Sequence, residues 1–330
     1  MVKHKEMIKI IGTGSYLPER ILTNADLEKM VDTSDEWIVT RTGIKERHIA
    51  ASNEASSDLA VKAARKAIEK AKIKPEDIDL IIVATVTPDM FFPSTACLVQ
   101  TQLGINNAAA FDVSAACSGF IYALSIAKQY LETGTSKLAL VIAAETLSRI
   151  TDWQDRNTCV LFGDGAGAAV LKKEEGDSGL LAFYLGADGQ YGDLLNMPAG
   201  GSRMPATEDT VKQRMHFLKM SGNAIFKVAV QSMIKSSQEV LKKSGLKCED
   251  VNLVIPHQAN IRIIEAMAKK VGIPMERVFL NIQKCGNMSS ATTAVGLDEA
   301  YREGRIKKRN IVELVAFGGG FTWGGCIMRW

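Results

Sequence analysis

The residues best suited to chemistry begin with a cysteine in the segment DVSAACSGF, residues 112–120. Cys117 follows a short apolar run typical of a strand and precedes GFIYALSIAKQYLE, whose apolar spacing predicts a helix. A sulfur at a helix N-terminus meets unpaired N–H groups and the positive end of the helix dipole, which favour a thiolate. Small neighbouring side chains would let a substrate carbonyl reach it. The segment therefore predicts a nucleophile, although a buried cysteine without function fits the pattern as well.

Two polar side chains at the ends of other predicted elements are further candidates. His257, in VIPHQAN, directly follows a buried strand, and Pro256 sets the turn after it. Asn287, in KCGNMSSAT, stands just before a predicted helix, and Gly286 permits a tight backbone there. A structural histidine and an ordinary helix-capping asparagine remain the alternatives.

A glycine-rich turn completes the set of candidates. The segment AFGGGFTWGG, residues 316–325, follows a buried strand pattern. Three successive glycines let backbone N–H groups come close to a bound atom, which suits an oxyanion hole. A plain tight turn at a sheet end is the alternative.

The elements that would position these residues occur twice along the chain. Residues 71–83, AKIKPEDIDLIIV, resemble residues 244–256, SGLKCEDVNLVIP. At nearly the same shift, the segment around Tyr130 resembles the segment around Tyr301. A shared shift over consecutive elements indicates an internal duplication.

The duplication predicts two halves, residues 1–174 and 175–330, joined by the polar link KKEEGDSG. Each half mixes amphipathic helices with nearly all-apolar strands, which predicts mixed sheets covered by helices and related by a pseudo-two-fold axis. Such folds place their sites between the halves, at the carboxyl ends of strands. The duplication also puts Cys117 and the Asn287 turn at equivalent helix starts, where they face each other across the axis.

Composition excludes several classes of protein. The net charge of +3 over 330 residues argues against a nucleic-acid binder. We expect no membrane span, because no apolar run is long enough, and no secretory signal at the basic N-terminus. The six cysteines form no C-x-x-C pair, which indicates reduced thiols and a cytoplasmic protein. Metal-ligand spacing is also missing, so we expect no metal.

Together, DVSAACSGF, VIPHQANIRI, GNMSSAT and FGGGFTWG resemble, in this order and spacing, the β-ketoacyl-acyl-carrier-protein synthase III enzymes of the thiolase superfamily. The resemblance covers nearly the whole chain, including DEWIVTRTGIKERHI, FPSTACLVQ and DRNTCVLFGDGAGAAVL. It implies an α/β thiolase-like fold, internally duplicated, in a five-layer αβαβα sandwich. A homodimer is the assembly that the family leads us to expect.

The resemblance also implies a reaction and a Cys-His-Asn triad, here Cys117, His257 and Asn287. Cys117 would take the acyl group of a primer acyl-CoA, such as an acetyl or short branched one. Malonyl-acyl carrier protein would then lose CO2, and its enolate, held by His257 and Asn287, would attack the acyl-enzyme to give 3-ketoacyl-acyl carrier protein. The backbone N–H groups of Cys117 and Gly319 would form the oxyanion hole. No cofactor is implied, since CoA enters as a substrate.

Three further sets of residues are carried over from the family. Trp37, Arg41 and Arg156 would contact the CoA nucleotide, by stacking and by phosphate binding. Phe92 would cross the dimer interface and close the acyl pocket. An exposed basic face would receive the acidic carrier protein, although a solvated helix face is the ordinary alternative. Its residues are Lys227, Arg262, Lys269 and Lys270.

The sequence departs from the family pattern at Cys285 and Met288, beside Asn287, and in the doubled phenylalanine of MFFPS. These departures leave the primer open. A chain-elongating synthase would need a second histidine, and a degradative thiolase a second catalytic cysteine, which Cys326 is placed poorly to supply. A starter synthase of secondary metabolism and a non-catalytic acyl-CoA-binding or carrier-protein-binding module remain alternatives. GDGAGA, residues 163–168, only superficially resembles a phosphate-binding loop.

Overall fold

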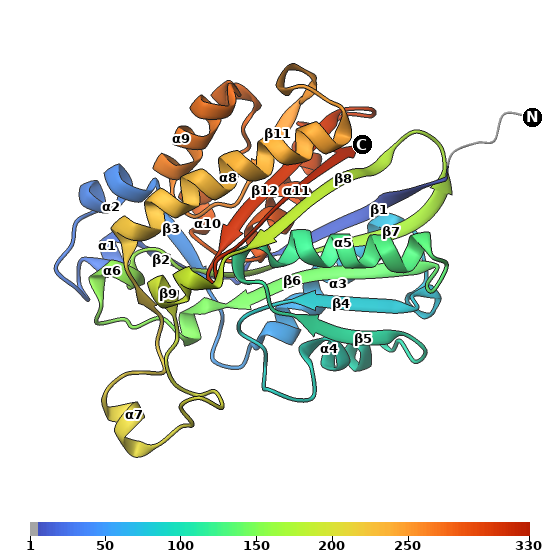
Figure 1. The fold of residues 1–330 in the computed structure, drawn as a ribbon. Helices are drawn as coiled ribbons and strands as arrows, with labels where there is room; N and C mark the ends of the chain where they lie inside the picture. The colour runs from blue at the N-terminus through green and yellow to red at the C-terminus, as the bar shows by residue number, and fades with distance from the viewer. Residues whose placement is uncertain (1–5) are drawn as a thin grey trace, which may run out of the picture.

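Two mixed β-sheets form the frame of the structure, a computed structural model that describes residues 6–330 (Figure 1). The first sheet has the strand order β1-β7-β6-β4-β5, in which β7 runs antiparallel to both neighbours. The second has the order β8-β13-β12-β11. Their strands are β1 (Glu6–Tyr16), β4 (Leu80–Ala84), β5 (Ala109–Val113), β6 (Leu138–Thr146), β7 (Asp164–Glu175), β8 (Gly179–Ala187), β11 (Leu253–Pro256), β12 (Ile311–Gly318) and β13 (Thr322–Arg329).

Helices form the three other layers. Helices α5 and α11 lie between the sheets and contact strands of both. Helices α3 and α4 cover the outer face of the first sheet, and α8 and α9 cover the outer face of the second (Figure 1). The predicted five-layer αβαβα sandwich is therefore confirmed. These helices are α3 (Ser56–Ala71), α4 (Thr95–Leu103), α5 (Gly119–Glu132), α8 (Gly222–Ser244), α9 (Ile261–Val271) and α11 (Ala291–Arg302).

Strand order confirms the duplication. Strands β1, β7, β6 and β4 occupy the same places in the first sheet as β8, β13, β12 and β11 in the second. The fifth place, filled by β5 in the first sheet, is represented in the second by a single parallel bridge between Val254 and Val278. The predicted link, residues 172–179, covers the last four residues of β7, which ends at Glu175, and reaches the start of β8 at Gly179.

Glycines let the middle helices approach the sheets closely. A Cβ atom at Gly167 would lie 2.5 Å from the Cβ of Ala294, so a larger residue would force α11 away from β7. A Cβ atom at Gly165, two residues earlier, would clash with the sulfur of Met288 in the same way. GDGAGA is thus a strand that packs under a helix and not a phosphate-binding loop.

A smaller cluster packs the antiparallel strand pair β2 and β3 against four short helices. At its centre Arg47 is fully buried, and its guanidinium donates to the carbonyl oxygens of Leu22 (3.1 Å) and Val160 (2.7 Å). A buried charge needs several such partners. The elements are β2 (Arg20–Thr23), β3 (Glu46–Ile49), α1 (Asn24–Leu27), α2 (Asp35–Thr42), α6 (Arg156–Cys159) and α10 (Ile282–Cys285).

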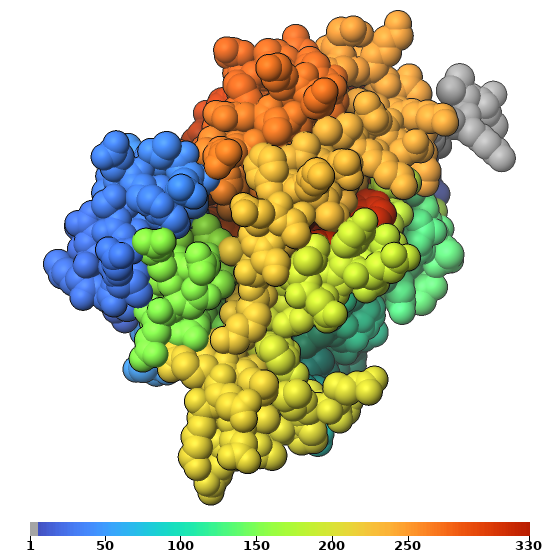
Figure 2. Space-filling model, turned by 60° about the vertical axis from the view of Figure 1, so that its left-hand side comes forward, coloured from blue at the N-terminus to red at the C-terminus, as the bar shows by residue number. Residues whose placement is uncertain are grey.

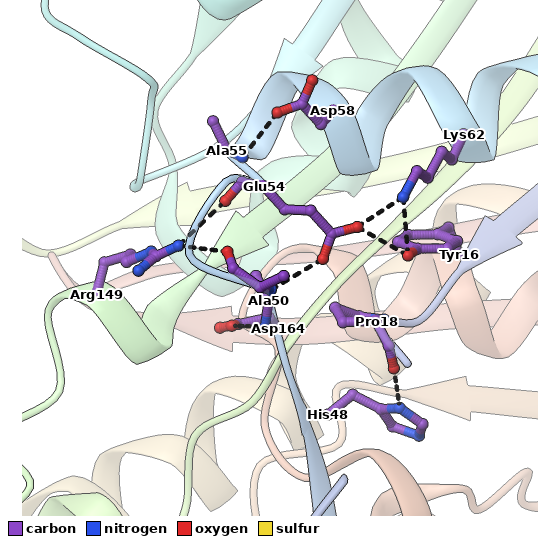
Figure 3. A network of polar contacts seen from close by, with 11 residues as sticks. Tyr16, Pro18, His48, Ala50, Glu54, Ala55, Asp58, Lys62, Arg149 and Asp164 are labelled. Carbon is purple, nitrogen blue, oxygen red and sulfur yellow. Dashed lines mark hydrogen bonds and ion pairs between the residues drawn. The ribbon is translucent and has the colours of Figure 1, made fainter. Parts of the chain in front are cut away.

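A polar network fastens the loop between β3 and α3 to its surroundings (Figure 3). Glu54 accepts hydrogen bonds from Lys62 (2.6 Å) and Tyr16 (2.9 Å), which belong to α3 and β1. Asp164, at the start of β7, accepts from the backbone N–H of Ala50 (2.7 Å). The network ties the loop before α3 to α3 itself and to strands β1 and β7 of the first sheet.

Residues 197–218 form a segment that projects from the body (Figure 2). Its base is closed by a two-residue ladder between β9 (Leu195–Asn196) and β10 (Lys219–Met220), and it carries α7 (Glu208–Lys212). The first half has no counterpart. The short 3-10 helices of the structure are η1 (Pro75–Asp77), η2 (Ala116–Ser118), η3 (Leu147–Arg149), η4 (Gly189–Leu194), η5 (Cys248–Asp250) and η6 (Met275–Arg277).

Within residues 6–330, no helix is long and apolar enough to cross a membrane. The same residues contain no group of three or more histidine, cysteine or acidic side chains placed to hold a metal ion.

One carboxyl group lies inside the outer core of the second half. Glu313, on β12, is fully buried, and neither of its carboxyl oxygens has a hydrogen-bond partner among residues 6–330. Its neighbours Val312 and Leu314 belong to the middle core, so its side chain points to the opposite face of the sheet, toward α8. Burial raises the pKa of Glu313 to about 7, and Ser237 on α8 lowers it.

We expect wild type to lose stability as the pH rises, and Glu313→Gln to lose less of it. A folded-state pKa above that of the unfolded chain stabilises the protein at low pH, and this contribution is lost as the pH rises through about 7. The free energy of unfolding of the variant relative to wild type should rise by roughly 2 kcal/mol between about pH 5 and pH 8. Urea denaturation at both pH values measures this. The exposed Glu76→Gln is the control, and an equal pH dependence in wild type and Glu313→Gln would contradict the prediction.

Candidate active site

The nucleophile candidate lies where β5 leads into α5. Cys117 sits in η2, directly before α5, as the sequence predicts. The residue before it, Ala116, has a φ of 45°, a left-handed conformation uncommon for a residue with a side chain. Ser289, before α11, has a φ of 46°, so a residue in the left-handed conformation precedes each of the two helices. Cys117 is 8% exposed and opens on a cavity of about 400 Å³.

The walls of this catalytic cavity are small or apolar near the sulfur. Ser114, Ala115 and Ala116 line it beside Cys117, in agreement with the expectation that small residues admit a substrate. Farther walls come from η3, from the β9 region and from the projecting segment. Their residues include Leu147, Ile150, Phe162, Leu195, Met197 and Leu218.

The glycine turn approaches the cysteine from the second half. A Cβ atom at Gly318 would lie 2.5 Å from the backbone nitrogen of Cys117, so only glycine fits there. The β12–β13 ladder ends at the pair Gly318–Thr322, and Gly319 in the turn beyond it lines the catalytic cavity. The structure thus brings Gly319 and Cys117 together, as an oxyanion hole requires.

His257 lies directly after β11 and is 1% exposed. Its Nδ1 lies 2.6 Å from the Thr292 hydroxyl on α11, and its ring packs edge-on against Phe317. Its backbone N–H donates to the carbonyl of Val315 (2.8 Å) in the neighbouring strand β12. Thr292 and Phe317 therefore hold the ring, which leaves Nε2 as the nitrogen available to a substrate.

Asn287 is held by backbone hydrogen bonds on both sides. Its N–H donates to the carbonyl of Leu161 (2.9 Å), and its carbonyl accepts from the N–H of Gly163 (3.0 Å). The side-chain Oδ1 accepts from the N–H of Ser289 (2.9 Å). Asn287 is therefore not the cap of α11, whose N-cap is Ser290, and its Nδ2 is the group left to donate.

Ser289 connects the three candidate residues. It lines the catalytic cavity together with Cys117, and its N–H orients the Asn287 amide. Its carbonyl accepts from Thr292, which contacts His257. His257 and Asn287 do not themselves line the cavity surface, so this serine marks where the three elements meet.

Cys117 and His257 are both uncharged at neutral pH. Burial raises the pKa of the Cys117 thiol from 9.0 to about 12, Ser289 lowers it and the Glu145 carboxyl raises it. That shift corresponds to about 4 kcal/mol, whereas a helix dipole contributes at most about 2 kcal/mol. The thiolate expected from the helix start is therefore wrong for the free protein. Burial alone lowers the pKa of His257 to about 3, so the imidazole is neutral.

A second cavity of about 640 Å³ lies beside the first and is bordered by α2, α6, α8 and the start of α9. Trp37, Arg41 and Arg156, predicted to contact CoA, all line this nucleotide-side cavity. The guanidinium carbon of each arginine lies 4.8 Å from the centre of the Trp37 ring system. Leu161 faces this cavity and Phe162 faces the catalytic one, so a single chain segment separates them.

The predicted carrier-protein residues are all exposed on α8 and α9, which pack against each other. Arg262 also lines the nucleotide-side cavity, and Lys227 directly follows its lining residue Phe226. Lys269 and Lys270 lie seven and eight residues beyond Arg262, about 10 Å farther along α9.

Phe92 does not reach the catalytic cavity of its own chain. It is 85% exposed in the loop between β4 and α4, next to the equally exposed Phe91. The departures Cys285 and Met288 are fully buried in the middle core, and burial raises the pKa of the Cys285 thiol further above its ordinary value. Cys326 is buried inside β13.

Sequence reasoning missed three residues of the site: Ser289, Thr292 and Glu145. Each acts through a contact between the two halves or between adjacent elements, which spacing along the chain does not reveal. The duplication did carry a signal, because it places Cys117 and the turn around Asn287 at equivalent helix starts. That match marks the start of α11 as part of the site.

Comparison with known families gives two matches. A family model described as 3-oxoacyl-[acyl-carrier-protein (ACP)] synthase III matches residues 111–189, which include Cys117. The model of its C-terminal part matches residues 241–330, which include His257 and Asn287.

Individual relatives match over nearly the whole chain. The β-ketoacyl-[acyl-carrier-protein] synthase III of Caldanaerobacter subterraneus is 60% identical over 321 residues, which cover 97% of each protein. The crystal structure of 3-oxoacyl-[acyl-carrier-protein] synthase III from Aquifex aeolicus has a TM-score of 0.91 and 52% identity, over 98% of this chain and 100% of that one. The priming β-ketosynthase of the R1128 polyketide pathway has a TM-score of 0.91 and 34% identity, over 100% and 98%. The chain belongs to the 3-oxoacyl-[acyl-carrier-protein] synthase III family.

Proposed function

We propose that this protein, an acyltransferase of the condensing-enzyme family, starts fatty-acid synthesis by joining a primer acyl group from acyl-CoA to malonyl-acyl carrier protein. The observation that carries the proposal is the pair of adjoining cavities. One is lined by an indole and arginines, suited to a nucleotide, and the other contains Cys117. A thioester that spans both would place its carbonyl at the sulfur.

In the first step the Cys117 sulfur attacks the acyl-CoA carbonyl. The sulfur–acyl bond forms, the bond from the acyl carbon to the CoA sulfur breaks, and the thiol proton ends on the released CoA. The backbone N–H groups of Cys117 and Gly319 hold the oxyanion that forms during this exchange. Burial keeps the acylated cysteine away from water.

In the second step malonyl-acyl carrier protein loses CO2. The developing enolate oxygen takes hydrogen bonds from Asn287 Nδ2 and His257 Nε2, both uncharged donors in a buried site. The enolate carbon then bonds to the acyl carbon, the bond to the Cys117 sulfur breaks, and the sulfur regains a proton from solvent. The products are CO2 and 3-ketoacyl-acyl carrier protein.

His257 donates from Nε2 only if its Nδ1 carries no proton. The Thr292 hydroxyl has one proton and two acceptors within reach, His257 Nδ1 (2.6 Å) and the Ser289 carbonyl oxygen (2.9 Å), and that carbonyl also accepts the backbone N–H of Thr292 (3.2 Å). In the proposed arrangement the hydroxyl donates its proton to Nδ1. That hydrogen bond selects the tautomer with Nε2 protonated. Thr292 thus sets the direction in which the imidazole donates.

The assembly follows from the same arrangement. Met90, Phe91 and Phe92 form an exposed apolar loop, which a second copy of the chain would cover in a homodimer.

The basic residues on α8 and α9 would receive the acidic carrier protein near the mouth of the nucleotide-side cavity. We place the protein in the cytoplasm, since the six cysteines are all free.

The likeness to a priming ketosynthase of a polyketide pathway favours one alternative. A starter enzyme of secondary metabolism would use the same cysteine and the same two cavities. It would differ in the carrier protein it accepts, so condensation rates with fatty-acid and polyketide carrier proteins discriminate between the two.

We expect Cys117→Ser to abolish acyl transfer to the protein. Wild type incubated with radiolabelled acetyl-CoA or a branched acyl-CoA should retain thioester-linked label after denaturation, and the variant should retain none. Cys97→Ser, a half-buried cysteine on α4, is the matched control and should keep the label. Label that persists in Cys117→Ser would place the nucleophile elsewhere.

We expect Thr292→Val to slow decarboxylation of malonyl-acyl carrier protein by about tenfold, because one orienting hydrogen bond is worth about 1.4 kcal/mol. Acylation of Cys117 should be unaffected. Thr293→Val is the control, since the Thr293 hydroxyl is buried and has no hydrogen-bond partner among residues 6–330. Equal rates of CO2 release in both variants would rule out the role of Thr292.

We expect Trp37→Ala to raise the KM for acyl-CoA roughly tenfold with little change in kcat, the size of one lost stacking contact. Trp37→Phe should recover most of the affinity. An acyl-pantetheine thioester, which lacks the nucleotide, should react equally well with all three proteins. If the loss is as large with acyl-pantetheine, Trp37 does not bind the nucleotide.

A further inference from the structure

The projecting segment, residues 197–218, forms part of the catalytic cavity although it belongs to neither sheet (Figure 2). Met197 and Leu218, at its two ends, line the cavity together with Cys117. The position of this wall therefore depends on the contacts that hold the segment against the body. The catalytic steps above assign these contacts no role.

Two residues of the segment carry its polar contacts to the rest of the chain. Among residues 6–330, Arg214 and Leu218 are the members of the segment that form a hydrogen bond or an ion pair with residues outside it. The N–H of Leu218 donates to the carbonyl of Ile150 (2.8 Å). Arg214 binds the carboxyl group of Asp152, two residues farther along the chain. Both contacts thus end on the same short loop.

Asp152 is buried and is bound by residues on both sides of Leu218 in the sequence. It is 5% exposed, and its two carboxyl oxygens accept from Nε (3.0 Å) and from a terminal nitrogen of Arg214, a bidentate arrangement. The ammonium group of Lys219, the first residue of β10, lies 3.8 Å from the same carboxyl group. The Arg214 guanidinium lowers the pKa of Asp152, so the carboxyl group is ionised at neutral pH. Ion pairs between exposed groups contribute little, but a buried carboxylate is destabilised strongly when its partner is removed.

The loop that carries Asp152 is itself fixed to the first sheet. Ser148, in η3, donates from its N–H (2.8 Å) and from its hydroxyl (2.6 Å) to the carboxyl group of Asp164, where β7 begins. The indole N–H of Trp153 donates to the carbonyl of Ser148 (3.2 Å). Ile150, in the same loop, also lines the catalytic cavity. The ion pair therefore connects the projecting wall of the cavity to a wall that the sheet holds in place.

The backbone of Arg214 adopts a conformation that needs support. Its φ is 56°, in the left-handed region that residues with a side chain seldom occupy. Such a conformation persists where the surrounding contacts fix it. The guanidinium carbon also lies 4.8 Å from the centre of the Phe217 ring, the residue before Leu218. The turn that leads into Leu218 is thus ordered around the ion pair.

We propose that Asp152 and Arg214 are positioning residues that hold Leu218 in the wall of the catalytic cavity and thereby limit the length of the acyl group that Cys117 accepts. The proposal rests on the proposed function, which makes the acyl group of acyl-CoA the occupant of this cavity. A branched side chain that is held in the wall excludes longer acyl groups, and one that can withdraw admits them. The ion pair acts from outside the cavity, since neither Asp152 nor Arg214 lines it.

Asp152→Asn removes the charge with little change of shape, and Arg214→Gln removes its partner. The measurement is the rate at which Cys117 takes label from radiolabelled hexanoyl-CoA and from radiolabelled acetyl-CoA. Each variant should raise the ratio of the two rates about tenfold, because the fit of a methylene group in an apolar pocket changes specificity by about this factor. A loss of folded protein lowers both rates equally and leaves the ratio unchanged.

Three further variants separate the ion pair from other effects. Glu208→Gln breaks the ion pair with Lys212 (3.3 Å) inside the same segment and should keep the wild-type ratio. Leu218→Ala removes the wall itself and should raise the ratio while the ion pair stays intact. The double variant of Asp152→Asn and Arg214→Gln should match the single variants, because all three lose one and the same interaction.

Trypsin cleavage after the exposed Arg203 gives a second readout that requires no acyl-CoA. The rate of cleavage, followed by mass spectrometry, reports how often the segment opens locally. Asp152→Asn should be cleaved faster than wild type, and Glu208→Gln should be cleaved at the wild-type rate.

The two readouts decide different parts of the proposal. A wild-type ratio in a folded Asp152→Asn would overturn the role in chain length, and an unchanged rate of cleavage would overturn the role in holding the segment. An equal rise of the ratio in Glu208→Gln would assign the effect to the segment as a whole and not to this ion pair. Wild type that takes no label from either donor would contradict the proposed function and with it the role in chain length, while the cleavage rates would still decide whether the ion pair holds the segment.

Discussion

The contact between the starts of α5 and α11 is the constraint on which the site depends. A Cβ atom at Gly119 would lie 3.1 Å from the Cβ of Ala84 and 3.3 Å from that of Ser290, so the two helix starts meet at almost the closest distance that side chains allow. Both sheets direct the carboxyl ends of strands to this place. Cys117 comes from one half, and the Asn287 turn and His257 come from the other. A wider spacing of the middle helices would separate the proposed nucleophile from the proposed hydrogen-bond donors.

The two cavities, which the segment containing Leu161 and Phe162 separates, differ in the charge of the groups around them. On the inner side the Cys117 thiol and the His257 imidazole are buried and neutral. On the outer side Arg41, Arg156 and Arg262 border a wider cavity. Phosphates would be bound where water is present, whereas the carbon–carbon bond would form where water is excluded. The thioester is long enough to need both environments.

Much of the fold could be predicted from the sequence because the duplication repeats whole elements in the same order. The place of Cys117 followed from the helix pattern after it, and the paired strands followed from their apolar runs. The contact between Glu145 and Ser290 and the place of Ser289 beside Cys117 could not be predicted, since each pair lies more than a hundred positions apart in chemically ordinary segments. The thiolate prediction was wrong because a helix terminus can be read from spacing, while the burial that outweighs it is a property of the packed core.

The projecting segment has a consequence for how such proteins diversify. Leu195, Met197 and Leu218, at its base, line the catalytic cavity, yet the segment belongs to neither sheet. A two-residue ladder closes its base, and a hydrogen bond from Leu218 to Ile150 and an ion pair between Arg214 and Asp152 hold it to the body. The duplicated frame must conserve its geometry to keep the two helix starts together. The far wall of the cavity does not have to keep this geometry. Substitutions in this insertion can therefore reshape the cavity wall without moving the proposed catalytic groups. Substrate preference can thus change during evolution while the reaction stays the same.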